Sequence, residues 1–116
     1  MTRRLPVLIS AVMYDARPFY RSDDLRKAAE QQRFDAFVVD WIVGDKNAQD
    51  LLALLRHRNA TAPIIVLTGQ QLMGPDEDDL AHAVMTLGLV FGEKPVRMSI
   101  LSATLARAFL TANLHA

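Results

Sequence analysis

Four short apolar runs constrain the fold of this chain more than any other feature. They are Leu5 to Ser10 (LPVLIS), Ala36 to Asp40 (AFVVD), Ile64 to Thr68 (IIVLT) and Leu89 to Phe91 (LVF). None alternates between apolar and polar residues, which is typical of strands buried on both faces of a parallel sheet. Because helical patterns lie between the runs, we predict an α/β fold in which helices cover both faces of a doubly wound parallel sheet.

The helical patterns carry the start and stop signals that helices use. We expect helices over Ser22 to Gln32, around Ala48 to Leu55, from Pro75 to Gly88, and from Met98 to about Asn113. Ser22 is predicted to cap the first helix with its side chain. The acidic run Asp76 to Asp79 falls in the first turn of the third helix, where the helix dipole favours negative charge.

Length and composition limit the classes of function. With 116 residues, 51% of them hydrophobic, we expect one core and a single domain over residues 1–116. Thirteen basic and thirteen acidic residues cancel, which argues against direct nucleic-acid binding. The chain has no cysteine, so a cytoplasmic location is the default expectation. No apolar run approaches the roughly 18 residues that a membrane span needs, and no enzyme signature is present, so we expect neither a membrane partner nor an enzyme.

Three reactive side chains follow the predicted strands. Asp40 ends one strand, Thr68 ends the next, and Lys94 follows the last. The carboxyl ends of parallel strands are where such sheets bind ligands, so we expect the three to lie together. A carboxylate can act as a nucleophile toward phosphorus, while a hydroxyl and an ammonium can hold phosphate oxygens. Pro95 fits a tight turn that aims Lys94 inward, and a cis Lys94–Pro95 bond is one way to build it.

The segments around these residues resemble the receiver domains of two-component response regulators. FDAFVVDWIV resembles the acceptor strand, PIIVLTG the strand that ends in a hydroxyl residue, and EKP the lysine-proline turn. The spacings are also similar, with 28 positions from Asp40 to Thr68 and 26 from Thr68 to Lys94. The resemblance implies a flavodoxin-like fold and a phosphoryl group that Asp40 accepts from a histidine kinase or a phosphotransfer protein. It further implies Mg²⁺ bound by Asp40 and the Ile42 carbonyl, and Phe91 as an aromatic switch.

The sequence departs from the receiver pattern at its first strand. Receivers carry a pair of acidic residues there, whereas LPVLIS leads into Ala11 and Val12. Asp40 and one carbonyl would then be the only protein ligands of Mg²⁺, unless Asp15 substitutes. A second reading follows from this departure. The chain is then a degenerate pseudo-receiver that serves as a phosphorylation-independent interaction or dimerisation module.

The first crossover is also short. Only Ala11 to Arg21 separate the first apolar run from the helix at Ser22, whereas a parallel crossover needs a dozen residues or more. Either the first helix of the family is lost, or Leu5 to Ser10 is the second strand and the central first strand is absent. The second option leaves a gap in the sheet that a homodimer or a domain swap has to fill.

Overall fold

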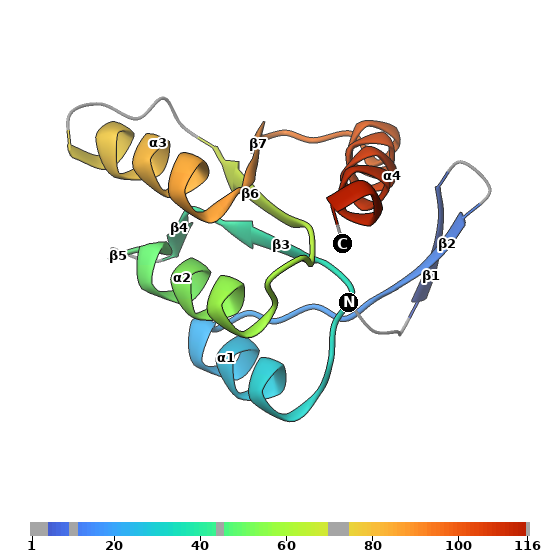
Figure 1. The fold of residues 1–116 in the computed structure, drawn as a ribbon, viewed down its shortest axis with the longest axis horizontal. Helices are drawn as coiled ribbons and strands as arrows, with labels where there is room; N and C mark the ends of the chain where they lie inside the picture. Colours follow the sequence, from blue (N-terminus) through green and yellow to red (C-terminus); the bar gives the residue numbers. More distant parts are fainter. Residues whose placement is uncertain (1–4, 10–11, 44–45, 70–74, 116) are drawn as a thin grey trace.

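The structure is a computed structural model that describes residues 5–9, 12–43, 46–69 and 75–115. Figure 1 shows helices packed around a short central sheet, with a separate hairpin beside the last helix. In chain order the elements are β1 Leu5–Ile9, β2 Val12–Ala16, α1 Ser22–Gln31, β3 Phe37–Asp40, β4 Ile42–Val43, β5 Lys46–Asn47, α2 Gln49–Arg58, β6 Ile64–Thr68, α3 Pro75–Leu87, β7 Val90–Glu93 and α4 Met98–His115.

The central sheet is parallel, with the strand order β3-β6-β7. Strand β3 pairs with β6 from Phe37 opposite Ile64 to Asp40 opposite Leu67. Strand β7 pairs with the other edge of β6. Three of the four predicted strands therefore form the predicted parallel sheet, and their carboxyl ends lie at the same edge.

The prediction for the first apolar run is wrong in one respect. Leu5–Ile9 does form a strand, but it pairs antiparallel with Val12–Ala16 in a separate two-stranded sheet instead of joining the parallel one. The described residues agree with one half of the second sequence reading, the absence of a central strand, since β3 has a neighbour on one side only. They do not agree with its other half, because Leu5–Ile9 is not the second strand of the parallel sheet. The physical reason is that the connection from Ile9 to Val12 is too short for a parallel crossover, so β1 pairs with the strand that follows it.

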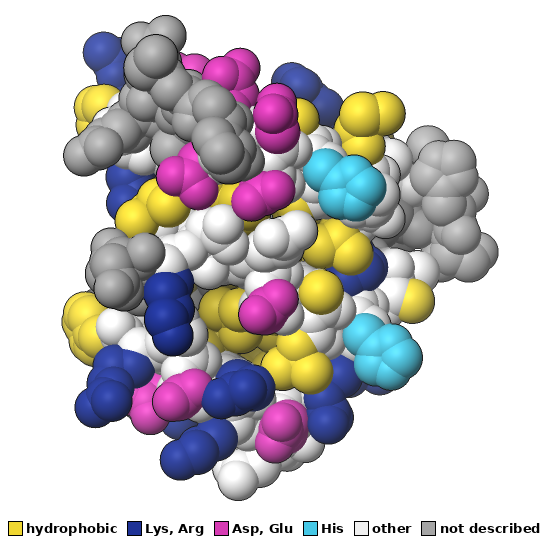
Figure 2. Space-filling view, turned by 90° about the vertical axis from the view of Figure 1, so that its left-hand side faces the viewer, with side chains coloured by type: hydrophobic (Ala, Val, Ile, Leu, Met, Phe, Trp, Pro, Cys, Tyr) yellow, Lys and Arg dark blue, Asp and Glu magenta, His cyan; other side chains and the backbone are white. Residues whose placement is uncertain are grey.

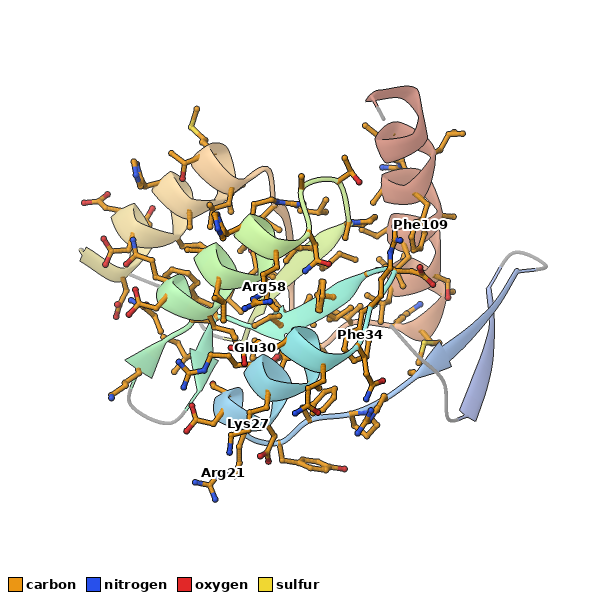
Figure 3. All side chains as sticks on the ribbon, turned by 60° about the horizontal axis from the view of Figure 1, so that its bottom comes forward. Arg21, Lys27, Glu30, Phe34, Arg58 and Phe109 are labelled. Atoms are coloured by element: carbon orange, nitrogen blue, oxygen red, sulfur yellow. The ribbon has the colours of Figure 1, made fainter. Side chains whose placement is uncertain are left out.

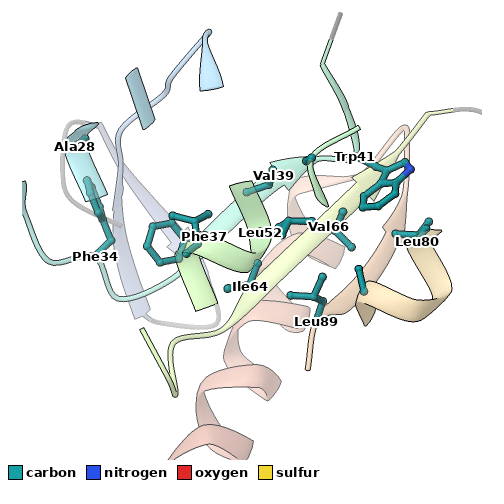
Figure 4. Packing of buried hydrophobic residues seen from close by; sticks show 13 residues of the cluster. Ala28, Phe34, Phe37, Val39, Trp41, Leu52, Ile64, Val66, Leu80 and Leu89 are labelled. Carbon is teal, nitrogen blue, oxygen red and sulfur yellow. The ribbon is translucent and has the colours of Figure 1, made fainter. Parts of the chain in front are cut away.

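The two faces of the parallel sheet are covered unequally. On one face α1, α2 and α3 enclose a large cluster that runs from Phe34 and Phe37 at one end to Trp41 and Leu80 at the other (Figure 4). On the opposite face α4 alone covers a cluster whose fully enclosed members are Ala36, Ile65 and Leu105. Helices on both faces of a parallel sheet confirm the predicted fold class, although one layer is thin.

Helix α4 is unusual in its composition. Arg107 is the only Lys, Arg, Asp or Glu residue between Met98 and His115. Several large apolar side chains of this helix, Met98, Ile100 and Leu110, are exposed. No helix within the described ranges is long and apolar enough to cross a membrane.

The helix starts and ends follow the sequence signals with one exception. Helix α1 begins at Ser22 itself, preceded by Arg21 as the N-cap, and no side chain caps it, so the predicted capping role of Ser22 is wrong. Asp23 and Asp24 lie in the first turn and favour the helix start through the dipole instead.

Gly88 ends α3 with a φ of 64°. This left-handed conformation is one that glycine adopts without steric cost. We expect Gly88→Ala to lower the free energy of unfolding by about 1 kcal/mol, because a Cβ is strained at this φ even though it would meet no atom within 4 Å. Urea unfolding followed by circular dichroism measures the change. A stability equal to that of the unaltered chain would contradict it.

A single arginine joins three segments at the amino end of the sheet. The Arg56 guanidinium donates hydrogen bonds to the carbonyl oxygens of Leu87, the last residue of α3, at 2.7 Å and of Gly88 at 3.2 Å. It also donates to those of Asn59 and Ala62 at 2.9 and 2.7 Å, in the connection from α2 to β6. Arg56 thus satisfies carbonyls that the helix ends leave unpaired.

Candidate functional site

The three predicted site residues lie at one edge of the parallel sheet. Asp40 is opposite Leu67 in the β3–β6 register, and Thr68, the next residue of β6, is opposite Glu93 of β7. The Lys94 backbone N–H donates to the Thr68 carbonyl oxygen at 2.8 Å, which extends the β6–β7 pairing by one residue. Parallel pairing in this register brings Asp40, Thr68 and Lys94 to the same place, as the strand pattern leads one to expect.

Asp40 and Lys94 form an ion pair. The Lys94 Nζ lies 3.0 Å from an Asp40 carboxylate oxygen, with side-chain exposed fractions of 42% and 48% respectively. Gly69 lies beneath the lysine, since a Cβ at this position would approach Lys94 Cδ to 3.4 Å. The Lys94–Pro95 peptide bond is cis, one of the two forms allowed by the sequence. The site therefore holds an acidic and a basic group in contact and still open to solvent.

The segment after Asp40 folds back toward the sheet. The Trp41 N–H donates to the Leu67 carbonyl at 2.7 Å, and the Ala48 N–H donates to the Trp41 carbonyl at 2.7 Å. Between them, Ile42–Val43 and Lys46–Asn47 form a two-residue antiparallel pair. The Trp41 side chain is fully buried, and its Nε1 has no hydrogen-bond partner among the described residues. Trp41 is thus a core residue that directly follows Asp40, the acidic residue of the site.

The described residues do not form a metal site of the usual kind. They contain no group of three or more His, Cys, Asp or Glu side chains that could hold an ion. Strand β2, which carries Asp15, lies with the hairpin at the opposite end of the sheet from β4 and β5 in both Figure 1 and Figure 3. The side chain of Asp15 lies outside the described part of the chain, so its expected role as a substitute for the acidic pair stays a prediction. A hard divalent cation prefers several oxygen ligands, and Asp40 with the Ile42 carbonyl offers fewer than Mg²⁺ usually takes.

A cavity of about 380 Å³ lies beside the site, between the sheet and α4. Its walls include Phe91 of β7, Arg97, and Ile100 and Leu101 of α4. Phe91, the predicted switch residue, is 44% exposed and borders this cavity. The sequence indicated Phe91 and included Gly69 in the PIIVLTG segment, but it did not predict that Gly69 contacts Lys94, 25 positions away.

Charges of both signs lie at this end of the molecule. Figure 2 views the protein from the side on which β4 and β5 lie, and shows acidic and basic side chains in both halves, with a group of acidic side chains in the upper half and most of the Lys and Arg side chains in the lower half. The acidic group matches Asp76, Glu77 and Asp78 in the first turn of α3, all exposed. A partner that approaches the site would meet both signs of charge, although the chain as a whole is neutral.

Comparison with known proteins finds similarity in structure only. No model of a protein family matches this sequence. No curated protein sequence matches it either.

Solved structures match with probability 1.00. The signal receiver domain of a modulated diguanylate cyclase from Desulfovibrio desulfuricans G20 has a TM-score of 0.69 at 21% identity, over 84% of this chain and 75% of that one. The signal receiver domain of a putative Luxo repressor protein from Vibrio parahaemolyticus has a TM-score of 0.70 at 21% identity, over 88% and 75%. A response regulator protein from Burkholderia pseudomallei, with a phosphorylated aspartic acid, a calcium ion and citrate, has a TM-score of 0.66 at 28% identity, over 89% and 59%.

Proposed function

We propose that this chain, which has the flavodoxin-like fold of response-regulator receiver domains, is a signalling receiver that accepts a phosphoryl group on Asp40. The donor is a phosphohistidine of a sensor histidine kinase or of a phosphotransfer protein. The observation that carries the proposal is the Asp40–Lys94 ion pair at the carboxyl ends of the strands, with Thr68 in the next register position. The similar protein from Burkholderia pseudomallei, which contains a phosphorylated aspartic acid, supports it.

The transfer requires only groups that the site and the donor supply. An Asp40 carboxylate oxygen attacks phosphorus in line with the P–N bond of the phosphohistidine, and a P–O bond forms. The P–N bond breaks with its electrons going to the imidazole, which leaves as neutral imidazole because its other ring nitrogen carries a proton. The product is an aspartyl phosphate. Lys94 moves its hydrogen bond from the carboxylate to a phosphate oxygen, and the Thr68 hydroxyl donates to another. Because the described residues do not form a metal site, no step here depends on Mg²⁺.

Beryllofluoride, which mimics an aspartyl phosphate, tests the proposal on the full chain. Titration in the presence of Mg²⁺, and again with EDTA in its place, is followed by the fluorescence of Trp41, the only tryptophan. We expect a saturable change that Asp40→Asn abolishes, because the amide removes the nucleophilic oxygen. Asp35→Asn is the matched control, since Asp35 is exposed and precedes the same strand. A change that survives in Asp40→Asn would rule out Asp40 as the acceptor.

A second candidate function is a pseudo-receiver that binds partners without phosphorylation. It is favoured by the absence of a group of three or more possible metal ligands among the described residues. This candidate predicts no beryllofluoride response in either the unaltered chain or Asp40→Asn. It also predicts that acetyl phosphate leaves the mass of the intact protein unchanged, whereas the receiver proposal predicts the addition of one phosphoryl group.

A further inference from the structure

We infer that the open edge of β3 binds strand β2 of a second copy of this chain, so that two molecules exchange their hairpins. The inference is independent of whether Asp40 accepts phosphate. It joins two observations: a strand whose one edge is unpaired, and a hairpin that belongs to no sheet larger than itself.

The open edge is defined by the hydrogen bonds of β3. Phe37 and Trp41 donate their N–H groups to the carbonyls of Pro63 and Leu67, on the β6 side, at 2.9 and 2.7 Å. Because the N–H and C=O of one strand residue point to the same edge, and this edge alternates from residue to residue, those of Val38 and Asp40 point away from β6. Within the described residues no strand pairs with that edge. These groups form a template for one more strand.

This edge is short and ends in a charged residue, Asp40, but it lacks the other features that protect edge strands. Its sequence FVVD contains no proline and no lysine, and no bulge interrupts its pairing with β6. The side chains are those of an interior strand, with Phe37 and Val39 buried toward the three helices and Val38 half-buried on the α4 side. A strand of this composition usually has neighbours on both sides.

The hairpin supplies a suitable strand. A two-stranded hairpin is marginally stable in water unless it packs against something larger, and the backbone of this one approaches chiefly α4. Pro6 in β1 has no N–H, so we place its nitrogen on the outer side of β1, where it would hinder further pairing. Strand β2, VMYDA, has no proline and offers the better outer edge.

The position of Phe19 argues for a second copy over the same chain. Its ring packs edge-on against Phe34 at 6.1 Å between centroids, and the Arg17 guanidinium lies 5.2 Å above it. Phe34 is labelled in Figure 3 and precedes β3 at the amino end of the sheet. If β2 paired in parallel with β3 so that both strands ended at the same level, Ala16 would lie beside Asp40. Asp40 is about 20 Å from Phe34 along an extended chain. The three residues from Ala16 to Phe19 span at most about 11 Å, so β2 of the same chain reaches this register only if that segment is fully extended and the Phe19 backbone also lies well toward Asp40. A second copy is free of this constraint.

Disulfide trapping tests the exchange, because the natural chain has no cysteine. One chain carries Val38→Cys, and a second carries Met13→Cys or Tyr14→Cys, adjacent positions that sample both faces of β2. After oxidation of the mixture, we expect one of the two pairings to give a disulfide-linked heterodimer as the main product. Ala81→Cys on the exposed side of α3 replaces Val38→Cys in the matched control and should give little of it. Sedimentation equilibrium of the unaltered chain should show a dimer.

Three outcomes would overturn the inference. The first is a chain that stays monomeric at concentrations of tens of micromolar and forms no heterodimer. The second is a dimer in which residue 38 links to neither position of β2, which would place the interface elsewhere, such as on α4. The third is a disulfide that forms only within a single chain carrying both cysteines, which would show that each hairpin folds back antiparallel onto its own β3.

Discussion

Replacing Arg56 by alanine is expected to lower the free energy of unfolding by about 2–4 kcal/mol. The guanidinium donates to carbonyl oxygens of Leu87, Asn59 and Ala62 in partly buried places, and the truncation leaves these three acceptors without this partner. Burial also lowers the pKa of Arg56 from its ordinary value, yet arginine stays charged at neutral pH, so its hydrogen bonds are charge-assisted.

Urea unfolding measures the effect, with two comparisons. Arg58→Ala lies two residues later on the same helix, is exposed, and should change stability by no more than about 0.5 kcal/mol. Arg56→Lys keeps the charge but not the planar fork, so it should recover only part of the loss. If Arg56→Ala behaved like Arg58→Ala, the hydrogen bonds of Arg56 would contribute little to the fold.

Replacing Lys94 by glutamine is expected to weaken beryllofluoride binding by about 10- to 100-fold, the effect of losing one hydrogen bond to a charged group. The Lys94 ammonium lies 3.0 Å from the Asp40 carboxylate and is the cation that the proposed transfer uses. Stability should change by less than about 1 kcal/mol, because both partners of this ion pair are nearly half exposed.

Because Lys94→Gln should lower the beryllofluoride affinity with little change in stability, the two measurements together distinguish a role in binding from a role in folding. Arg97→Gln removes a neighbouring exposed charge and should leave the affinity within about twofold of the unaltered chain. Isothermal titration with beryllofluoride gives the affinities, and urea unfolding gives the stabilities. Equal affinities for Lys94→Gln and Arg97→Gln would mean that Lys94 pairs with Asp40 without serving bound phosphate.

The parallel sheet could be predicted from the sequence because its strands are buried on both faces. The uninterrupted apolar segments AFVVD and IIVLT indicate burial on both faces, and the packing of their side chains then sets the register between the two strands. The fate of Leu5 to Ile9 could not be predicted in the same way. An apolar strand has the same sequence pattern whether it joins a parallel sheet or a local hairpin. Which of the two forms depends on the connection that follows the strand.

The candidate site, like the fold, could be predicted from the sequence only in part. The positions of Asp40, Thr68 and Lys94 follow from one rule, that parallel strands end at a common edge. The contact between Gly69 and Lys94 depends on the path of one side chain, which no local pattern encodes. The hydrogen bonds of Arg56 were likewise not predictable, since an arginine on an amphipathic helix usually faces solvent.

The unequal covering of the sheet implies that the molecule does not open uniformly. On the α4 side the fully enclosed residues are Ala36, Ile65 and Leu105, whereas the three-helix side encloses a much larger set. Segments with little buried apolar contact open at lower free energy than the rest of a domain. Amide hydrogens of α4 should therefore exchange with solvent through a local detachment of this helix, well before those of β6. Such a detachment would uncover the cavity beside Phe91 while the opposite layer, and the strand that carries Asp40, stay folded.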